Sequence, residues 1–307
     1  MNKSTHKTSI GGQALIEGVM MRGPKTTAMA VRNPEGEIVL EKWDTPESQL
    51  PKICKLPFIR GIFNMINSLR FGYKCLMRSA EIAGLEEPEK EEDKKKNQVT
   101  MNILMVCSVV LAMFLSVGLF IYLPSFLFRL FAKAAPSMDT RVWRAVFEGG
   151  FRILLFVGYM CAMLLMKDIR RTFMYHGAEH KAIFCYEKGL ELTVENVQKM
   201  RRFHPRCGTS FMILVLLVGV IVSMFITAKS PLLRTGIKLL TLPIVTGVGY
   251  ELIKFAGRHD NLFTRFISAP GVWLQRITTR EPDDGQVECA IRALSETLTG
   301  NPEDDKW

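Results

Sequence analysis

The chain has 307 residues, of which 48% are hydrophobic, and its formal charge is +10. Its seven cysteines contain no CxxC pair, and Cys107 and Cys161 lie inside apolar runs, which argues against a disulfide framework and favours a reducing compartment. Much of the positive charge flanks the apolar runs, so we expect membrane lipids as partners and no nucleic acid.

The first segment, residues 1–54, is predicted to combine a glycine-rich stretch with a β-hairpin. MNKSTHKTSIGGQ has no apolar core, so no signal peptide is expected. Apolar residues alternate in TTAMAVRNPEGEIVLEKW on both sides of the turn residues NPEG, which predicts a small antiparallel hairpin. The stretch before it, IGGQALIEGVMMRGP, holds Glu17 and Arg22 among closely spaced glycines but lacks the Gly-Lys-Ser/Thr element of a P-loop.

Residues 55–84 have apolar side chains at helical spacing. Five basic residues and no acidic residue lie between Lys55 and Arg78, which predicts an amphipathic helix. Such a helix either lies on an anionic membrane surface or packs on the protein's own core. The charged residues 85–100 are expected to form a solvated linker.

Four apolar runs between residues 101 and 258 predict a mainly α, polytopic membrane protein with about four transmembrane helices. Residues 101–128 and 211–228 carry no charge over 28 and 18 residues, whereas 153–166 and 239–250 are shorter. Flanking basic side chains can snorkel and lengthen the short runs. The alternative is two spans with re-entrant segments.

Basic residues flank these runs unevenly. They are frequent in the segment 167–210 and before the first run, which places this segment and both termini in the cytoplasm of a multi-pass protein of the cell membrane. Lys133, Arg141 and Arg144, in the opposite loop, oppose that orientation.

Two shorter helices are expected outside the spans. One begins after Thr193 as its N-cap and ends before Pro205. The other lies in the C-terminal cytoplasmic tail, residues 259–307, where Asp283 and Asp284 would stabilise the N-terminus of an amphipathic helix.

The most specific pattern is YHGAEHKAIF, which follows the second apolar run. If the helix of that run continues into this stretch, His176 and His180 project side by side and can share one metal ion. The order H-x-x-E-H, with Glu179 inside it, is that of inverzincin metalloproteases. The loop HPRCG adds His204 and Cys207, and nitrogen and sulfur donors favour zinc among divalent ions.

Three arrangements of the site remain open. The two histidines and Glu251 could bind zinc, with Glu179 as the general base. They could instead bind an open catalytic metal together with His204, with either glutamate as the base. Finally, Cys207 could close the shell around a structural metal, which leaves no position for water. Without a metal, the two histidines would be a buried, hydrogen-bonded pair.

Three further charged residues could serve the same site. Glu17 could reach the metal as a second catalytic carboxylate, and Arg22 or Arg206 could hold an anionic group of a substrate. Each has a simpler explanation: the glycine-rich stretch would be an entry to the hairpin, and Arg206 would contact lipid headgroups.

Four passages resemble the YqhQ-like family of bacterial membrane proteins: GGQALIEGVMMRGP, YHGAEHKAIFCYE, HPRCGTSF and PGVWLQRITTREPDDGQVECAI. The resemblance extends from Gly11 to Leu298. It implies a polytopic protein of the bacterial inner membrane and a metal-dependent enzyme, with no settled reaction or substrate.

We therefore expect an integral membrane, metal-dependent hydrolase whose site lies at the cytoplasmic membrane boundary. Its substrate would be a lipid or a segment of a membrane protein. The alternative is a non-catalytic scaffold or regulator with a structural metal. A transporter is less favoured, because the two long apolar runs lack the charged residues that ion pathways need.

Overall fold

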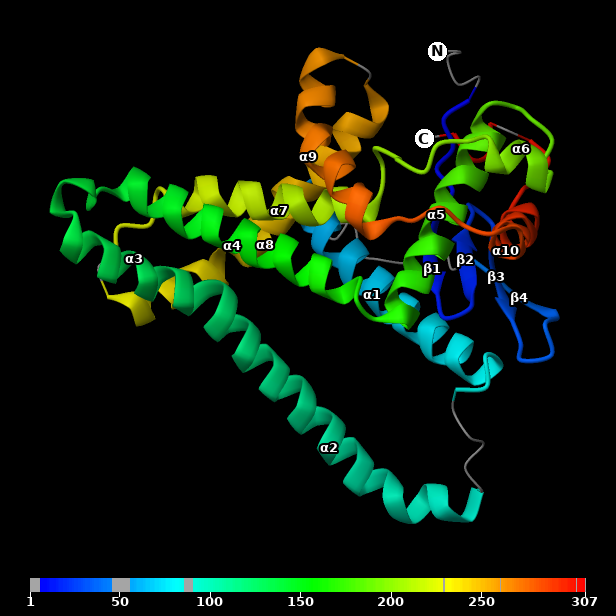
Figure 1. The fold of residues 1–307 in the computed structure, drawn as a ribbon, viewed down its shortest axis with the longest axis horizontal. Helices are drawn as coiled ribbons and strands as arrows, with labels where there is room; N and C mark the ends of the chain where they lie inside the picture. Colours follow the sequence, from blue (N-terminus) through cyan, green and yellow to red (C-terminus); the bar gives the residue numbers. More distant parts are fainter. Residues whose placement is uncertain are drawn as a thin grey trace.

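The computed structural model describes residues 6–45, 56–85, 91–228, 230–259, 261–301 and 303–306. They build a four-stranded sheet with helices on both faces and, beside it, an elongated bundle of apolar helices (Figure 1). The candidate site lies where these two parts meet.

The sheet is an antiparallel meander with the strand order β1-β2-β3-β4. Its strands are β1 Gly11–Leu15, β2 Gly18–Arg22, β3 Thr26–Arg32 and β4 Ile38–Asp44. The predicted hairpin is β3–β4, in which Arg32 pairs with Ile38. The glycine-rich stretch is itself a hairpin, β1–β2, so its glycines belong to strands and to the turn between them.

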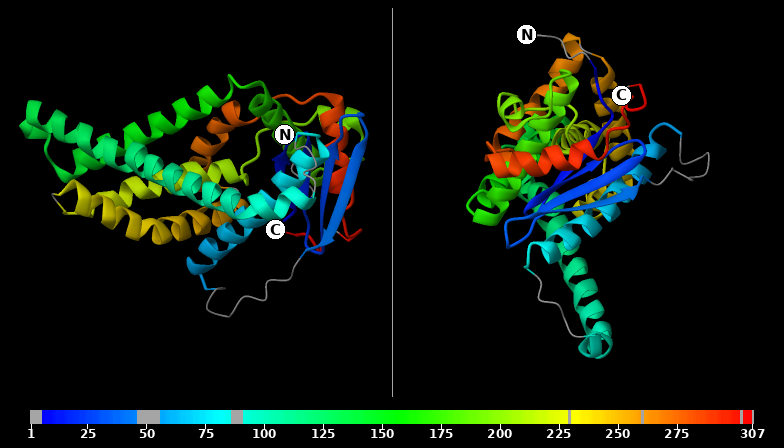
Figure 2. Two further views of the ribbon diagram at one scale, coloured as in Figure 1. Left: turned by 90° about the horizontal axis from the view of Figure 1, so that it is seen from below. Right: turned by 90° about the vertical axis from the view of Figure 1, so that its right-hand side faces the viewer.

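Both faces of the sheet are covered because both sets of alternating side chains in β2 are apolar. Val19 and Met21 pack with α5, Lys167–Glu187, and α10, Asp284–Ser295. Met20, between them, faces the opposite side, where it packs with Cys75 of α1. The two views of Figure 2 show the sheet between these helices.

Helix α1, Ile59–Ile82, confirms the predicted amphipathic helix, and its C-terminal half packs on the protein's own core. Its Cys75 contacts the sheet, and its Gly61 lies against Tyr250 of α8. Leu69 and Tyr73 remain 64% and 57% exposed, so an apolar strip of this helix is free to contact lipid.

The bundle consists of the π-helical turn η2 Gly118–Tyr122, α3 Leu123–Ala134, α4 Arg141–Met163, α7 Gly208–Ser223, α8 Pro231–Arg258 and α9 Leu262–Thr278. Helix α2, Glu91–Val117, leads into η2 and extends away from the bundle (Figure 1). Three stretches are long and apolar enough to cross a membrane: Val106–Ala134, Arg141–Met163 and Leu232–Arg258. Helix α7 is apolar but has only 16 residues. The chain is therefore a polytopic membrane protein, as predicted.

The structure differs from the prediction at three boundaries. Residues 91–100 form the start of α2 and not a linker, since glutamate and lysine are good helix formers; residues 86–90 lie outside the described part. Helix α4 ends at Met163 and extended backbone at Met166 separates it from α5, so the expected continuous helix is wrong. Helix α9 lies within the predicted tail.

The two small predicted helices are present. Thr193 caps α6, Val194–Gln198, by accepting a hydrogen bond from the Asn196 backbone N–H. Asp283 caps α10 in the same way, and Gln286 completes a capping box.

Candidate functional site

The site is built on α5, which packs between β1, α6 and α10. Gly177 permits this close packing, because a Cβ at that position would lie 2.0 Å from the carbonyl oxygen of Arg280. His176 and His180 project from one side of α5, and their ring centroids are 4.4 Å apart. The break after α4 does not affect this pairing, because both histidines lie within α5.

Backbone carbonyls fix both imidazoles. His176 Nδ1 lies 2.8 Å from the Thr278 oxygen, and His180 Nδ1 lies 2.5 Å from the Arg202 oxygen. Because a carbonyl can only accept a hydrogen bond, each Nδ1 carries a proton, and Nε2 is the nitrogen that could bind a metal once it has lost its own proton. Histidine ligands of metals are commonly oriented in this way.

Cys207 brings the third donor. It is the N-cap residue of α7, its Sγ lies 3.1 Å from His176 Nε2, and the residue is 8% exposed. The donor atoms of His176, His180 and Cys207 lie within 4.8 Å of one another, which makes them the candidate metal group of the described residues. We call these three residues the donor cluster.

The electrostatics of the donor cluster favour a thiolate. Burial raises the pKa of the Cys207 thiol, but the imidazoles of His176 and His180 outweigh burial and hold it well below its usual value. Burial lowers the pKa of His176, but the charge of Cys207 outweighs it and raises that pKa to about 9. A thiolate beside two oriented imidazoles is a donor set that suits zinc, and three protein donors leave a fourth tetrahedral position open.

Glu179 lies beside the donor cluster and is only 5% exposed. Its Oε1 accepts a hydrogen bond of 3.1 Å from the backbone N–H of Gly12 in β1. Burial raises the pKa of Glu179, while the charges of His176 and His180 oppose this shift. Gly12 is required for the approach, because a Cβ there would lie 2.9 Å from Glu179 Cγ and Cδ.

Glu17 tethers the sheet to α5 and lies outside the donor cluster. It occupies the β1–β2 turn with φ 51°, an uncommon conformation for a residue other than glycine. Arg171 donates two hydrogen bonds to the Glu17 carboxylate, one of them 2.7 Å long. The hydroxyl of Tyr175 donates a third, of 3.1 Å. These partners precede His176 on the same helix.

His204 and Arg206 form a separate buried group with Glu187. Arg206 pairs with Glu187, whose Oε2 lies 3.8 Å from His204 Nε2. The backbone of His204 is held by Gln275 through bonds of 2.7 and 2.6 Å. Burial lowers the pKa of His204 to about 4. The ring of His204 is 5.6 Å from that of His180, centroid to centroid, but His204 is not in the donor cluster.

Glu251 is engaged elsewhere. Arg60 of α1 binds both of its carboxylate oxygens, at 2.7 and 2.5 Å, and the Phe58 backbone N–H donates at 3.3 Å. This ion pair joins α1 to α8, and Glu251 does not belong to the donor cluster.

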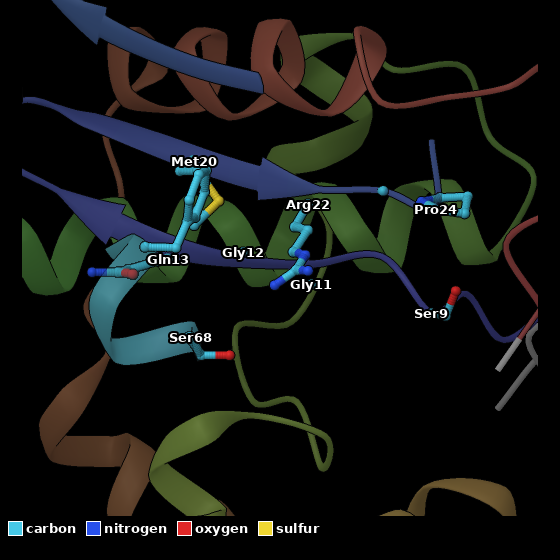
Figure 3. A pocket seen from close by; sticks show the side chains of 10 residues that line it. Ser9, Gly11, Gly12, Gln13, Met20, Arg22, Pro24 and Ser68 are labelled. Atoms are coloured by element: carbon cyan, nitrogen blue, oxygen red, sulfur yellow. The ribbon is translucent and has the colours of Figure 1, made fainter. Parts of the chain in front are cut away.

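Arg22 lines a pocket of about 340 Å³ between the β1–β2 hairpin and α1. Figure 3 shows its side chain beside Gly11 and Gly12 of the paired strand, with Ser68 of α1 across the pocket. Gly12 thus lines the pocket and also donates to Glu179. Within the described chain, the Arg22 guanidinium makes no hydrogen bond or ion pair, so it is available to an anionic ligand.

Sequence reasoning missed the backbone groups that orient the site: the Thr278 and Arg202 carbonyls and the Gly12 N–H. Every residue carries such groups, so no residue type signals them. Two of them lie in or next to passages already noted, since PGVWLQRITT contains Thr278 and GGQALIEG contains Gly12.

The family described as "Protein of unknown function (DUF1385)" matches residues 56–300. The chain is similar to "Uncharacterized protein YqhQ" of Bacillus subtilis (strain 168), with 35% identity over 306 residues that cover 97% of this chain and 95% of that protein. No solved structure matches the chain.

Proposed function

The chain belongs to the DUF1385 family, and we propose that it is a membrane-embedded, zinc-dependent hydrolase. The observation that carries this proposal is the convergence of a ring nitrogen from each of two histidines and one Sγ atom within 4.8 Å, with both Nδ1 atoms close to backbone carbonyls. His176, His180 and Cys207 would hold the ion. Bound zinc supplies a Lewis acid that makes water acidic enough to react near neutral pH.

Glu179 is the proposed general base. Its Oε1 is occupied by the Gly12 N–H, and its Oε2 has no hydrogen-bond partner in the described chain, so Oε2 can accept a proton from the attacking water. The fixed Oε1 contact orients the carboxylate, which lowers the entropy cost of the proton transfer. Glu17 and Arg171 would keep the β1–β2 hairpin docked on α5.

The substrate class follows from position and charge. The donor cluster lies where α7 begins and just after α4 ends, at the end of the bundle beside the sheet. Arg22 supplies a free positive charge in the neighbouring pocket. We therefore propose a lipid or membrane-protein segment with an anionic group as the substrate. We also propose that this end faces the cytoplasm of a bacterial cell, because basic residues are frequent there.

Metal content is the first test. Detergent-purified protein is expected to contain about one zinc per chain by plasma mass spectrometry, and His176→Ala/His180→Ala should lose it. His259→Ala, at the exposed end of α8, is the matched control and should retain it. Stoichiometric zinc in the double variant, or no zinc uptake by folded wild-type protein, would contradict the site.

Glu179→Gln then separates catalysis from a structural metal. This variant should keep zinc and the fold but lose about 100-fold or more of hydrolysis, measured with fluorescent phospholipids and a membrane-peptide library. If the variant hydrolyses these substrates at the wild-type rate, Glu179 does not transfer a proton in the reaction. In that case a scaffold or regulator with a structural metal would account better for the site.

The 3.1 Å contact between Cys207 and His176 favours a second candidate, a cysteine hydrolase without metal. The Cys207 thiolate would attack an acyl carbon, and His176 would donate its proton to the leaving group before water hydrolyses the thioester. Two measurements separate the candidates. A zinc enzyme loses activity to a chelator and keeps part of it in Cys207→His, whereas a thiol enzyme tolerates the chelator and is inactive in that variant.

A further inference from the structure

A second group of charged side chains lies inside the bundle, among the N-terminal halves of α4 and α8. Its members are all buried: Glu148, Arg152, Arg234 and Lys238. Three basic residues face one acidic residue, so the group carries two positive charges that no acidic side chain among the described residues balances. Charge buried among apolar helices of a membrane protein is costly and commonly marks a ligand site.

Glu148 cannot neutralise all three cations. Lys238 pairs with its Oε2, which also accepts from Arg152 at 3.3 Å, while Arg234 Nε lies 3.5 Å from Oε1. Three positive groups therefore share one carboxylate. The surplus of positive charge remains after every ion pair in the group is counted.

Arg234 has a structural role at the end of α7. Its two terminal nitrogens donate to the Ile226 and Ser223 carbonyls at 2.8 and 3.2 Å. Ser223 is the last residue of α7 and Ile226 follows it closely, so both carbonyls lie at the C-terminal end of the helix, where a cation is favoured by the helix dipole. Arg234 thus caps α7, and the remaining positive charge belongs to Arg152 and Lys238.

Arg152 and Lys238 both keep unused donors. Arg152 donates to the Phe120 carbonyl at 2.7 Å through Nε and to Glu148 through Nη2, which leaves Nη1 without a partner in the described chain. Lys238 bonds Glu148 and, at 3.3 Å, Ser125, so one of its three N–H groups is free.

These two cations line one pocket. It has a volume of about 220 Å³, lies between η2, α4, α7 and α8, and is otherwise mainly apolar. Val215 and Leu216 of α7 and Leu242 and Val245 of α8 are among its apolar lining residues. Two positive groups with spare donors, continuous with an apolar lining, match a molecule that has an anionic head and a hydrocarbon chain.

We propose that this pocket binds an anionic lipid, with the anionic headgroup on Arg152 and Lys238 and part of an acyl chain along α7 and α8. A small inorganic anion fits less well, because it would lose its hydration shell and gain few donors in an apolar lining. The site is separate from the donor cluster, which lies at the opposite end of α7. The proposal does not depend on zinc or on hydrolysis.

Native mass spectrometry of the full chain in neutral detergent tests this proposal. After delipidation, phosphatidylglycerol and phosphatidylcholine with the same acyl chains are added at equal concentration. One phosphatidylglycerol should remain bound under activation that removes phosphatidylcholine, with at least a tenfold difference in retention. Equal retention of the two lipids would overturn the proposal.

Two variants locate the lipid. Arg152→Gln should reduce phosphatidylglycerol retention at least tenfold, whereas Arg129→Gln, at an exposed position of α3, should leave it unchanged. Glu148→Gln removes the competing carboxylate and should increase retention, which a loss of folding cannot mimic. Wild-type retention in both Arg152→Gln and Glu148→Gln would overturn the assignment. Displacement of the lipid by millimolar inorganic phosphate would assign the pocket to a free anion instead.

Discussion

The histidines of α5 show what residue types and spacing can predict. The i, i+4 spacing of His176 and His180 fixes their proximity once the segment is helical, because the helix itself brings them together. The loop HPRCG was expected to supply both His204 and Cys207, and the structure brings only Cys207 into the donor cluster. Glu251 shows the limit: its engagement by Arg60 depends on how α1 packs against α8, which spacing along the chain does not encode.

A substitution at Gly12 tests the hydrogen bond between its backbone N–H and Glu179. In Gly12→Ala, the new Cβ would lie 2.9 Å from the Glu179 side chain and 2.7 Å from the Met20 carbonyl. Since the glutamate or the strand must shift, we expect at least a tenfold loss of hydrolysis with zinc retained, and about 1–3 kcal/mol lower unfolding free energy.

Gly11→Ala is the matched control, because a Cβ there would meet nothing within 4 Å. Activity, zinc content and chemical unfolding are measured for both variants. Equal activity of the two would show that the position of Glu179 does not limit turnover.

His204 makes stability depend on pH. Its pKa is about 4 in the folded chain and 6.5 in the unfolded chain, so between these values the unfolded chain binds the extra proton. The stabilisation is therefore complete above pH 6.5 and is lost as pH falls toward 4. Two and a half pKa units correspond to about 3 kcal/mol.

Urea unfolding of metal-free protein at pH 7 and pH 4.5 measures this dependence, and chelation removes the separate effect of pH on metal binding. His204→Gln should flatten the dependence, whereas His259→Gln, at an exposed position, should preserve it. If the unfolding free energy of His204→Gln depends on pH as strongly as that of the wild type, other groups cause the dependence.

At the scale of the elements, the sequence predicted correctly those helices and strands whose turn, periodicity or cap lies within their own residues. The β3–β4 hairpin, α1 and α10 each carry their own turn, periodicity or cap, and each is present. The β1–β2 hairpin escaped prediction because its strands are short and glycine-rich. Helix α9 was not predicted, because it contains Pro270 and lies in the segment expected to be a cytoplasmic tail.

The capping box of α10 gives an element-scale prediction. Asp283→Ala removes the acceptor for the Gln286 backbone N–H and should lower the unfolding free energy by about 1 kcal/mol. Asp283→Asn is the control, because asparagine caps helices about as well as aspartate without the charge. Thermal unfolding of the two variants checks this, and equal losses would assign the effect to charge.

At the scale of the whole molecule, the first and last described segments of the chain meet. His6 binds Asp305 at 2.6 Å, Thr8 Oγ1 donates to the same carboxylate at 2.7 Å, and Asp305 is 2% exposed. Helix α7 starts beside α5, and α8 starts near the far end of α7, where Arg234 binds Ser223. Three stretches are long enough to cross a membrane and α7 is only about 24 Å long, so the four crossings expected from the apolar runs stay a prediction.

Reporters fused to the two termini test that prediction. Because His6 and Thr8 are hydrogen-bonded to Asp305, both reporters should lie on the same side of the membrane, and the distribution of basic residues predicts the cytoplasm. A cytoplasmic fluorescent protein and a periplasmic phosphatase provide complementary readouts. Opposite sides for the two reporters would contradict an even number of crossings.

The carbonyl that holds His176 has a consequence for the order of events during synthesis. Thr278 leaves the ribosome about 100 residues after His176, and the bundle helices α7 and α8 must be inserted in between. Until then the first imidazole lacks its orienting partner, even though Gly12 and α5 are already available. A nascent or truncated chain that lacks Thr278 is therefore expected to bind metal about 10–100-fold more weakly than the full chain.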